Sequence, residues 1–166
     1  MAARKSKKEA EPAPAEERLQ GFIDKFLPER AAAIRFAYAR MLERWPAANV
    51  LVYDNYNFFV LGFGPSERAS EAIFSLACQA KRVSLCFLYG ARLPKKLDPH
   101  GLLKGSGNQV RSLRLEPIEL IDAPEVVALQ QAANAHAKVP IPKQGTGAVS
   151  IKSVSTKQRP RRPAGR

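Results

Sequence analysis

Four apolar runs follow one another closely between residues 49 and 89, and their short connections restrict the possible folds more than any other feature of this chain. The connections are residues 55–56, 64–70 and 80–81. Two parallel neighbours in a sheet need a crossover of about a dozen residues or more. We therefore predict consecutive antiparallel strands, which in chain order are NVLVYD (49–54), NFFVLGF (57–63), EAIFSLACQ (71–79) and RVSLCFLY (82–89).

The last two runs also predict how they pair. A turn at Ala80–Lys81 aligns apolar side chains on one face of the hairpin: Phe74 with Phe87, Leu76 with Leu85 and Cys78 with Val83. Cys86 falls on the opposite face, because successive side chains of a strand alternate between faces. The two cysteines of the chain are therefore predicted to be free thiols, which is typical of a reducing compartment.

Apolar residues at helical spacing precede and follow these strands. The pattern starts near residue 16, and Pro28 suits the first turn of a second helix that we expect to end near Trp45. QVRSLRL (109–115) is predicted to be a fifth strand, and a last helix is predicted to begin at DAPE, with Asp122 as its cap. The expected fold class is α+β, with an antiparallel sheet of about five strands, two N-terminal helices and one C-terminal helix in two layers.

Both ends of the chain are basic and lack apolar periodicity. Residues 1–15 carry a net charge of +2 and residues 138–166 a net charge of +8, whereas the middle carries +2 of the total +12. Segments rich in Pro, Ser, Gly and like charges bury too little apolar surface to fold. We therefore predict a disordered N-terminal tail over 1–15, one domain over 16–138 and a disordered basic tail over 139–166.

Candidate catalytic and metal-binding residues are few. Zinc needs four closely arranged ligands, whereas the cysteines fall on opposite faces and the two histidines, His100 and His136, are distant in the sequence. No serine stands in a Gly-x-Ser-x-Gly setting, and no base is recognisable beside a cysteine. Asp54, at a strand end, is expected to be a solvated turn residue. We therefore expect no metal, no cofactor and no catalytic residue, and the sequence favours a binding protein over an enzyme.

The glycine-rich stretch GLLKGSGNQV (101–110) has two interpretations. It lacks the spacing of a phosphate-binding P-loop and precedes a strand, so Gly105–Ser106–Gly107 is interpreted first as a tight turn. The alternative is a contact with an anion or ligand, because basic side chains flank the turn. Together with aromatic side chains of the first hairpin, which either stack on a ligand or pack in the core, they define a predicted ligand site: Tyr53, Tyr56, Lys104, Arg111 and Arg114.

Three blocks of the sequence together resemble the YdhG-like family, also known as domain of unknown function 1801: VYDNYNFFVLGFGPSERASEAIFSLA, VSLCFLYGARLPKKLDPHGLLKGSG and VRSLRLEPIELIDAPEVVALQQAA. The resemblance covers about residues 16–137 and implies a small α+β domain with an antiparallel sheet and no general assigned reaction. Some relatives are described as frataxin-like iron chaperones. That role requires clustered carboxylates, whereas this chain offers Glu16, Glu17, Asp24 and Glu29 in its first helices without a dense acidic ridge, and its basic tails would repel Fe²⁺.

These patterns favour a small binding domain whose ligand is unknown, with an iron chaperone and an enzyme with an unrecognised site as alternatives. The basic tail is predicted to add nonspecific affinity for nucleic acid or another polyanion, unless it is only a solubilising extension. The residues expected to carry this affinity are Lys152, Lys157, Arg159, Arg161, Arg162 and Arg166. No apolar run is long enough to span a membrane, so we expect a cytoplasmic protein without a membrane partner.

Overall fold

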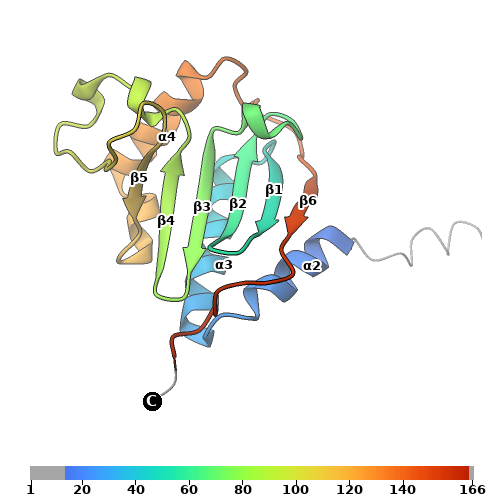
Figure 1. Cartoon of the computed structure of the whole chain (residues 1–166). Helices are drawn as coiled ribbons and strands as arrows, with labels where there is room; N and C mark the ends of the chain where they lie inside the picture. The colour runs from blue at the N-terminus through green and yellow to red at the C-terminus, as the bar shows by residue number, and fades with distance from the viewer. Residues whose placement is uncertain (1–13, 165–166) are drawn as a thin grey trace, which may run out of the picture.

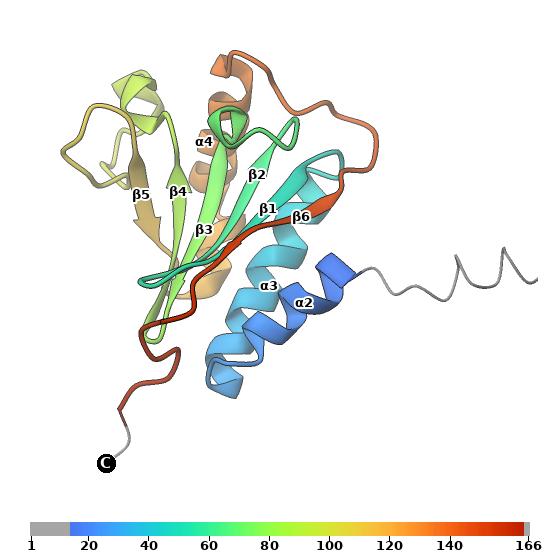
Figure 2. The same cartoon turned by 45° about the vertical axis from the view of Figure 1, so that its right-hand side comes forward.

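Residues 14–164 are described by a computed structural model, in which helices cover one face of an open six-stranded sheet (Figures 1 and 2). This confirms the predicted α+β class. The helices are α2 (Pro14–Ile23), α3 (Pro28–Arg44) and α4 (Pro124–His136). The strands are β1 (Asn49–Asp54), β2 (Phe59–Gly64), β3 (Phe74–Gln79), β4 (Arg82–Phe87), β5 (Arg111–Arg114) and β6 (Val149–Val154). Short 3-10 turns are η1 (Ala69–Glu71), η2 (Gly90–Arg92), η3 (Lys95–Leu97) and η4 (Ile118–Asp122).

The strands lie in the order β5-β4-β3-β2-β1-β6, and the first five pair antiparallel with their neighbours in sequence. The predicted register of the β3–β4 hairpin is confirmed, since Phe74 pairs with Phe87, Leu76 with Leu85 and Cys78 with Val83. Cys78 and Cys86 are both free. Because the register places apolar side chains on the same face, β3 and β4 present a continuous apolar surface to the helices.

The core lies between that surface and the helices. Phe22 and Phe26 pack on Phe59, with ring centroids 6.0 and 6.1 Å away. Trp45, the residue that follows α3, stacks obliquely on Phe74 at 5.2 Å. These aromatic contacts explain why the helical stripe at the start of the chain and the apolar faces of the strands fold as one unit.

The last helix begins differently from the prediction. Its N-cap residue is Ala123, which makes no side-chain cap hydrogen bond. Asp122 instead accepts from the guanidinium groups of Arg44 at 2.7 Å and Arg40 at 2.9 Å. The predicted cap is therefore wrong, because two arginines on α3 outcompete the backbone amides of α4 for this carboxylate.

The C-terminal segment is not a disordered tail as far as the structure describes it. β6 pairs parallel with β1 and adds a sixth strand to the sheet. In both views the chain then runs below the sheet, towards the β3–β4 turn (Figures 1 and 2). The composition of residues 139–166 predicted disorder, and long-range pairing overrides that preference. Most of the predicted N-terminal tail, residues 1–13, lies outside the described part of the chain.

Among the helices of residues 14–164, none has the length and apolar character needed to cross a membrane.

Candidate functional site

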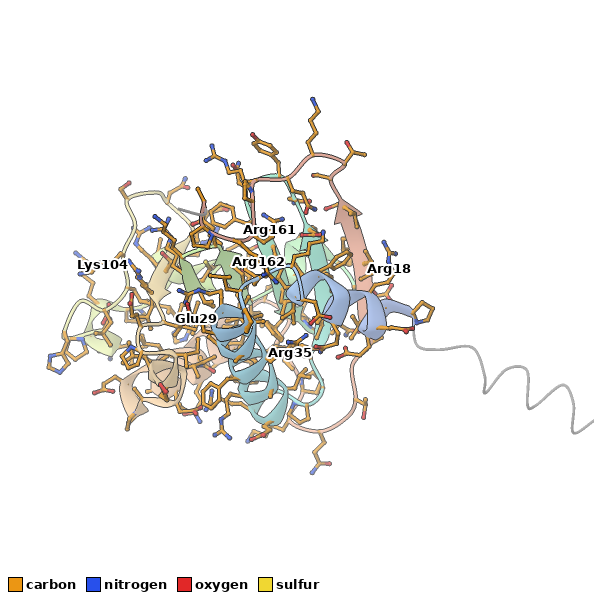
Figure 3. The ribbon with its side chains drawn as sticks, turned by 90° about the horizontal axis from the view of Figure 1, so that it is seen from below. Arg18, Glu29, Arg35, Lys104, Arg161 and Arg162 are labelled. Atoms are coloured by element: carbon orange, nitrogen blue, oxygen red, sulfur yellow. The ribbon has the colours of Figure 1, made fainter. Side chains whose placement is uncertain are left out.

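The five residues of the predicted ligand site do not come together. Tyr53 and Tyr56 lie on or just after β1, whereas Arg111 and Arg114 lie on β5, with three strands between. Neighbouring strands are about 4.8 Å apart, so β1 and β5 are separated by about 19 Å. Figure 3 likewise shows Lys104 well apart from the C-terminal arginines. The five side chains therefore do not line one pocket.

The glycine-rich loop holds a cation of its own chain. Nη1 of Arg111 donates to the carbonyl oxygens of Gly107 at 2.6 Å and Val110 at 2.8 Å. Gly105 has φ +141°, a conformation that favours glycine, and Lys104 pairs with Ser112 through backbone hydrogen bonds. The carbonyls face a guanidinium, which is the opposite polarity from an anion cradle. The structure therefore supports the tight turn, with Arg111 as its internal partner.

A buried carboxylate fixes the C-terminal segment on the opposite edge of the sheet. Asp54, at the end of β1, has no exposed surface, and Oδ1 accepts from Arg161 at 2.8 Å while Oδ2 accepts from Lys25 at 2.7 Å. The backbone carbonyl of Asp54 accepts from Ser155 N at 2.9 Å and from the Gln158 side chain at 2.7 Å. Residues 155–161 are therefore attached to β1 by both side-chain and backbone hydrogen bonds.

Asp54 is ionised in this setting. Burial raises the pKa of a carboxyl group, but the hydrogen bonds from Lys25 and Arg161 outweigh burial and hold the pKa of Asp54 below its usual range. A carboxylate held in its charged form by two cations is a poor general base, because it has little tendency to accept a proton. Asp54, Lys25 and Arg161 therefore anchor the C-terminal segment to the end of β1.

The anchored segment closes one side of a basic hollow of about 540 Å³. Six of its described lining residues are basic and none is acidic. They come from the β3–β4 turn, the end of β5 and the C-terminal segment: Lys81, Arg82, Arg114, Arg159, Arg161 and Arg162. We call this site the basic hollow. Seen from below, Arg161 and Arg162 lie next to each other where the C-terminal segment passes α2 and α3 (Figure 3).

Two of these cations are neutralised and four are not. Arg161 is 5% exposed and pairs with Asp54, and Arg114 pairs with Glu116 at 2.7 Å. Among residues 14–164, no carboxylate forms an ion pair with Lys81, Arg82, Arg159 or Arg162; the basic hollow therefore carries a net positive charge.

The uncompensated arginines are held by neutral groups. Nε of Arg82 donates to the Gln79 side chain at 2.9 Å, and Nε of Arg162 donates to the Lys25 carbonyl at 3.0 Å. Arg159 lies over the ring of Tyr56, 5.7 Å from its centroid. These contacts orient the guanidinium groups while leaving their charge available to a ligand.

Some of the residues predicted for the ligand site and for the basic tail lie at the basic hollow, and the others lie elsewhere. Arg114 lines the basic hollow, and Tyr56 borders it through Arg159. Lys152 on β6 and Lys157 are exposed outside the lining, and Arg166 lies outside the described residues.

The described residues form neither an activated cysteine nor a group of metal ligands. Burial raises the pKa of both cysteine thiols, Cys78 in the core and Cys86 beside Ser75, so neither is activated as a nucleophile. No three His, Cys, Asp or Glu side chains within residues 14–164 are grouped to hold a metal. Glu16 and Asp24, two acids considered for iron, are bound to Tyr38 and Arg35.

Sequence patterns missed the anchor and partly signalled the sixth strand. VSIKSV (149–154) alternates apolar and polar residues at its start and contains β-branched side chains, which is a strand signal. The contact between Asp54 and Arg161 joins residues 107 positions apart and leaves no local signal.

Comparisons with known proteins found no matching family model, no matching curated protein and no matching solved structure. The resemblance to the YdhG-like family stays a prediction.

Proposed function

We propose that the protein is a small, non-enzymatic domain that binds single-stranded nucleic acid without sequence preference in the basic hollow. The observation that carries this proposal is the group of four cations, Lys81, Arg82, Arg159 and Arg162, gathered around one depression without a paired carboxylate. Phosphate groups along a nucleic acid strand attract such a group and release counterions on binding.

An aromatic side chain beside the basic hollow favours a single strand over a duplex. Tyr56 is 50% exposed, and its ring is in contact with Arg159. Proteins that bind single strands combine a basic groove with an aromatic surface on which an unpaired base stacks. The stacked pair of Tyr56 and Arg159 supplies both features at one place, whereas bases inside a duplex are already stacked on one another.

The walls of the basic hollow are held in place before any ligand arrives. Nη2 of Arg30 on α3 donates to the Lys81 carbonyl at 2.9 Å and fixes the β3–β4 turn. Arg161 fixes the opposite wall through Asp54. A preformed site loses less conformational entropy on binding than a flexible tail does. We therefore assign the affinity for nucleic acid to the folded C-terminal segment and not to a disordered tail.

Two broader expectations accompany this proposal. The free thiols of Cys78 and Cys86 suit a cytoplasmic protein. Membership of the YdhG-like family is proposed on the three sequence blocks alone.

The test is fluorescence anisotropy of a labelled single-stranded oligothymidine with the full chain, titrated at several salt concentrations. One variant replaces Lys81, Arg82, Arg159 and Arg162 by Gln. Each lost phosphate contact reduces the log–log salt slope of a single strand by about 0.7, so four reduce it by about 3.

A matched variant replaces four exposed lysines outside the basic hollow, Lys95, Lys96, Lys104 and Lys143, by Gln. Its net charge changes equally, and we expect it to keep most of the affinity and slope. Equal losses in both variants would show that binding follows overall charge and would reject this site. A duplex of the same length binding as tightly as the single strand would reject the role of Tyr56.

A further inference from the structure

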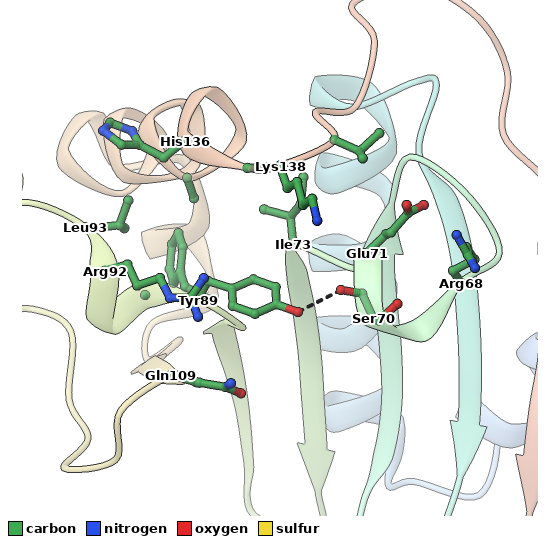
Figure 4. Close-up of a pocket in the computed structure, with 15 residues that line it drawn as sticks. Arg68, Ser70, Glu71, Ile73, Tyr89, Arg92, Leu93, Gln109, His136 and Lys138 are labelled. Atoms are coloured by element: carbon green, nitrogen blue, oxygen red, sulfur yellow. Dashed lines mark hydrogen bonds between the residues drawn. The ribbon is translucent and has the colours of Figure 1, made fainter.

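A second cavity, of about 560 Å³, lies at the other end of the sheet, between η1, η2 and the end of α4 (Figure 4). Its volume is that of a typical small-molecule site. It shares no lining residue with the basic hollow. We call it the upper cavity.

The floor of the upper cavity is apolar. Ile73 on the approach to β3 is 4% exposed, and Phe87 at the end of β4 is fully buried. Leu93, just after η2, and Ala133 on α4 line the sides. Gly90 also lines the upper cavity, and its missing side chain lets β5 pack closely there, because a Cβ at Gly90 would stand 2.7 Å from Cβ of Arg111. Such a surface favours a ligand with an apolar, ring-sized body.

One hydrogen bond joins the two loops that flank the upper cavity. The Tyr89 hydroxyl donates to the Ser70 carbonyl at 2.7 Å, which links η1 to the segment before η2 (Figure 4). The Tyr89 ring forms one wall of the upper cavity. The Arg92 guanidinium lies over this ring, 5.2 Å from its centroid. The wall is therefore a stacked Tyr–Arg pair whose guanidinium edge remains available for hydrogen bonds.

Positive charge dominates the rim. The cations Arg68, Arg92 and Lys138 line the upper cavity, and the one acidic residue among its described lining is Glu71. Glu71 accepts a hydrogen bond from the Ser66 hydroxyl at 2.5 Å. No ion pair within residues 14–164 neutralises any of the three cations. An apolar floor with an excess of cations at the rim selects molecules that are apolar at one end and anionic at the other.

We propose that the upper cavity binds a small aromatic anion, with its ring on the apolar lining at Ile73, Leu93 and Ala133 and its carboxylate or phosphate group at Arg92, in the field of Arg68 and Lys138 at the rim. The ring fills the apolar floor, and the planar guanidinium of Arg92 accommodates either acid group in a forked geometry. This assignment uses none of the residues of the basic hollow and stands independently of nucleic-acid binding.

Three probes of one shape test the assignment: 1-naphthoate, 1-naphthyl phosphate and the neutral 1-naphthamide. Each is titrated into the isotope-labelled full chain while backbone amide shifts are followed by NMR. We expect dissociation constants of about 1 mM for the anions, as for fragments of this size, with shifts centred on η1, η2 and the end of α4. The neutral 1-naphthamide cannot form a charge-assisted hydrogen bond, so we expect it to bind about tenfold or more weakly than the anions.

The two anionic probes distinguish the acid group. Tighter binding of 1-naphthyl phosphate assigns the upper cavity to phosphate esters, and tighter binding of 1-naphthoate assigns it to carboxylates. Either result supports the proposal.

Two variants distinguish the contribution of the rim cations to binding from that of the apolar floor. Replacing Arg68, Arg92 and Lys138 by Gln is expected to remove the preference for the anions while leaving the naphthamide affinity unchanged. Ala133→Leu is expected to weaken all three probes, because the larger side chain occupies the upper cavity. Replacement of Lys95, Lys96 and Lys143 by Gln changes the net charge equally and is expected to leave all three affinities unchanged.

The proposal is overturned by naphthamide binding as tightly as the anions, or by shifts centred elsewhere on the molecule. It is also overturned if no probe binds with a dissociation constant below about 10 mM, because the apolar floor would then hold no ring.

Discussion

Two basic, glycine-containing segments of this chain look alike in sequence and behave differently in the fold. The loop over 101–110 and the C-terminal segment over 139–162 both carry Lys or Arg, and neither contains an acid. The loop is held locally, by Arg111 on two carbonyls next to it in the chain. The C-terminal segment forms β6 and is held by Asp54, a residue about a hundred positions away.

The difference lies in what each arginine binds, Arg111 in the loop, which is half-buried, and Arg161 in the C-terminal segment, which is buried. Arg111 uses neutral carbonyl oxygens within its own loop, so its hydrogen bonds restrain that loop alone. Arg161 binds a buried carboxylate. Breaking an ion pair that is shielded from water strongly destabilises the fold, because the remaining partner is left as a buried charge without compensation. The same residue type therefore closes a local turn in one segment and fastens a terminus to the core in the other.

The largest effect is expected from Asp54→Asn. The change leaves Arg161 buried without a counter-charge, and the free energy of unfolding is expected to fall by about 3–5 kcal/mol. Urea denaturation of the full chain measures it. Asp24→Asn is the matched control, because Asp24 pairs with Arg35 on the surface and its loss costs about 1 kcal/mol or less. Equal effects of the two substitutions would show that Asp54 is not an anchor.

A somewhat smaller effect is expected from Gly147→Ala, just before β6. A Cβ at Gly147 would overlap the carbonyl of Ala48, which is backbone and cannot rotate away. We expect a loss of about 3 kcal/mol and faster amide hydrogen exchange in residues 149–154. Gly107→Ala in the loop is the control, since a Cβ there meets no atom within 4 Å. Unchanged exchange in β6 after Gly147→Ala would contradict the docking of this strand.

Gly105→Ala is expected to act locally and more weakly. Its φ of +141° is unfavourable for alanine and costs about 1–2 kcal/mol. Amide hydrogen exchange should increase in the loop and at β5 but not in β6, because Arg111 connects only to its own segment. Faster exchange throughout the sheet would show that the loop supports the whole domain.

The smallest change is expected on mild acidification. The pKa of Asp54 is held below its usual range, so its contribution to stability is fully present above the unfolded value of about 3.9 and is lost as pH falls through the lower, folded value. Amide signals of residues 155–161 should therefore stay constant from about pH 7 to 5 and change below about pH 4. Amide signals of Gly107 and Val110 serve as the internal reference, because their carbonyls hold Arg111 without a carboxylate. Leu102 and Leu103 are left out of this reference, since the Asp98 carboxylate accepts from their amides. An early change in residues 155–161, near pH 6, would contradict an ionised Asp54.

Much of the sheet follows from local patterns, and much of the site does not. The β3–β4 register is predictable because one turn and one apolar face admit a single alignment of Phe74 with Phe87. Asp122 shows where local patterns fail, since a sequence that resembles a helix cap is recruited by two arginines on α3. Asp54 looks like a turn residue until its burial and its two cations are seen together.

The sequence by itself determined the α+β class, the antiparallel pairing of the first four strands and the free thiols, because these depend on periodicity and on short connections between neighbours. Only the tertiary structure decided that the C-terminal segment folds, that its arginines divide into paired and unpaired cations, and that an apolar cavity with a basic rim lies at the far end of the sheet. The physical reason is that burial and ion pairing join residues distant in the chain, and no local pattern records which distant groups will share one low-dielectric environment.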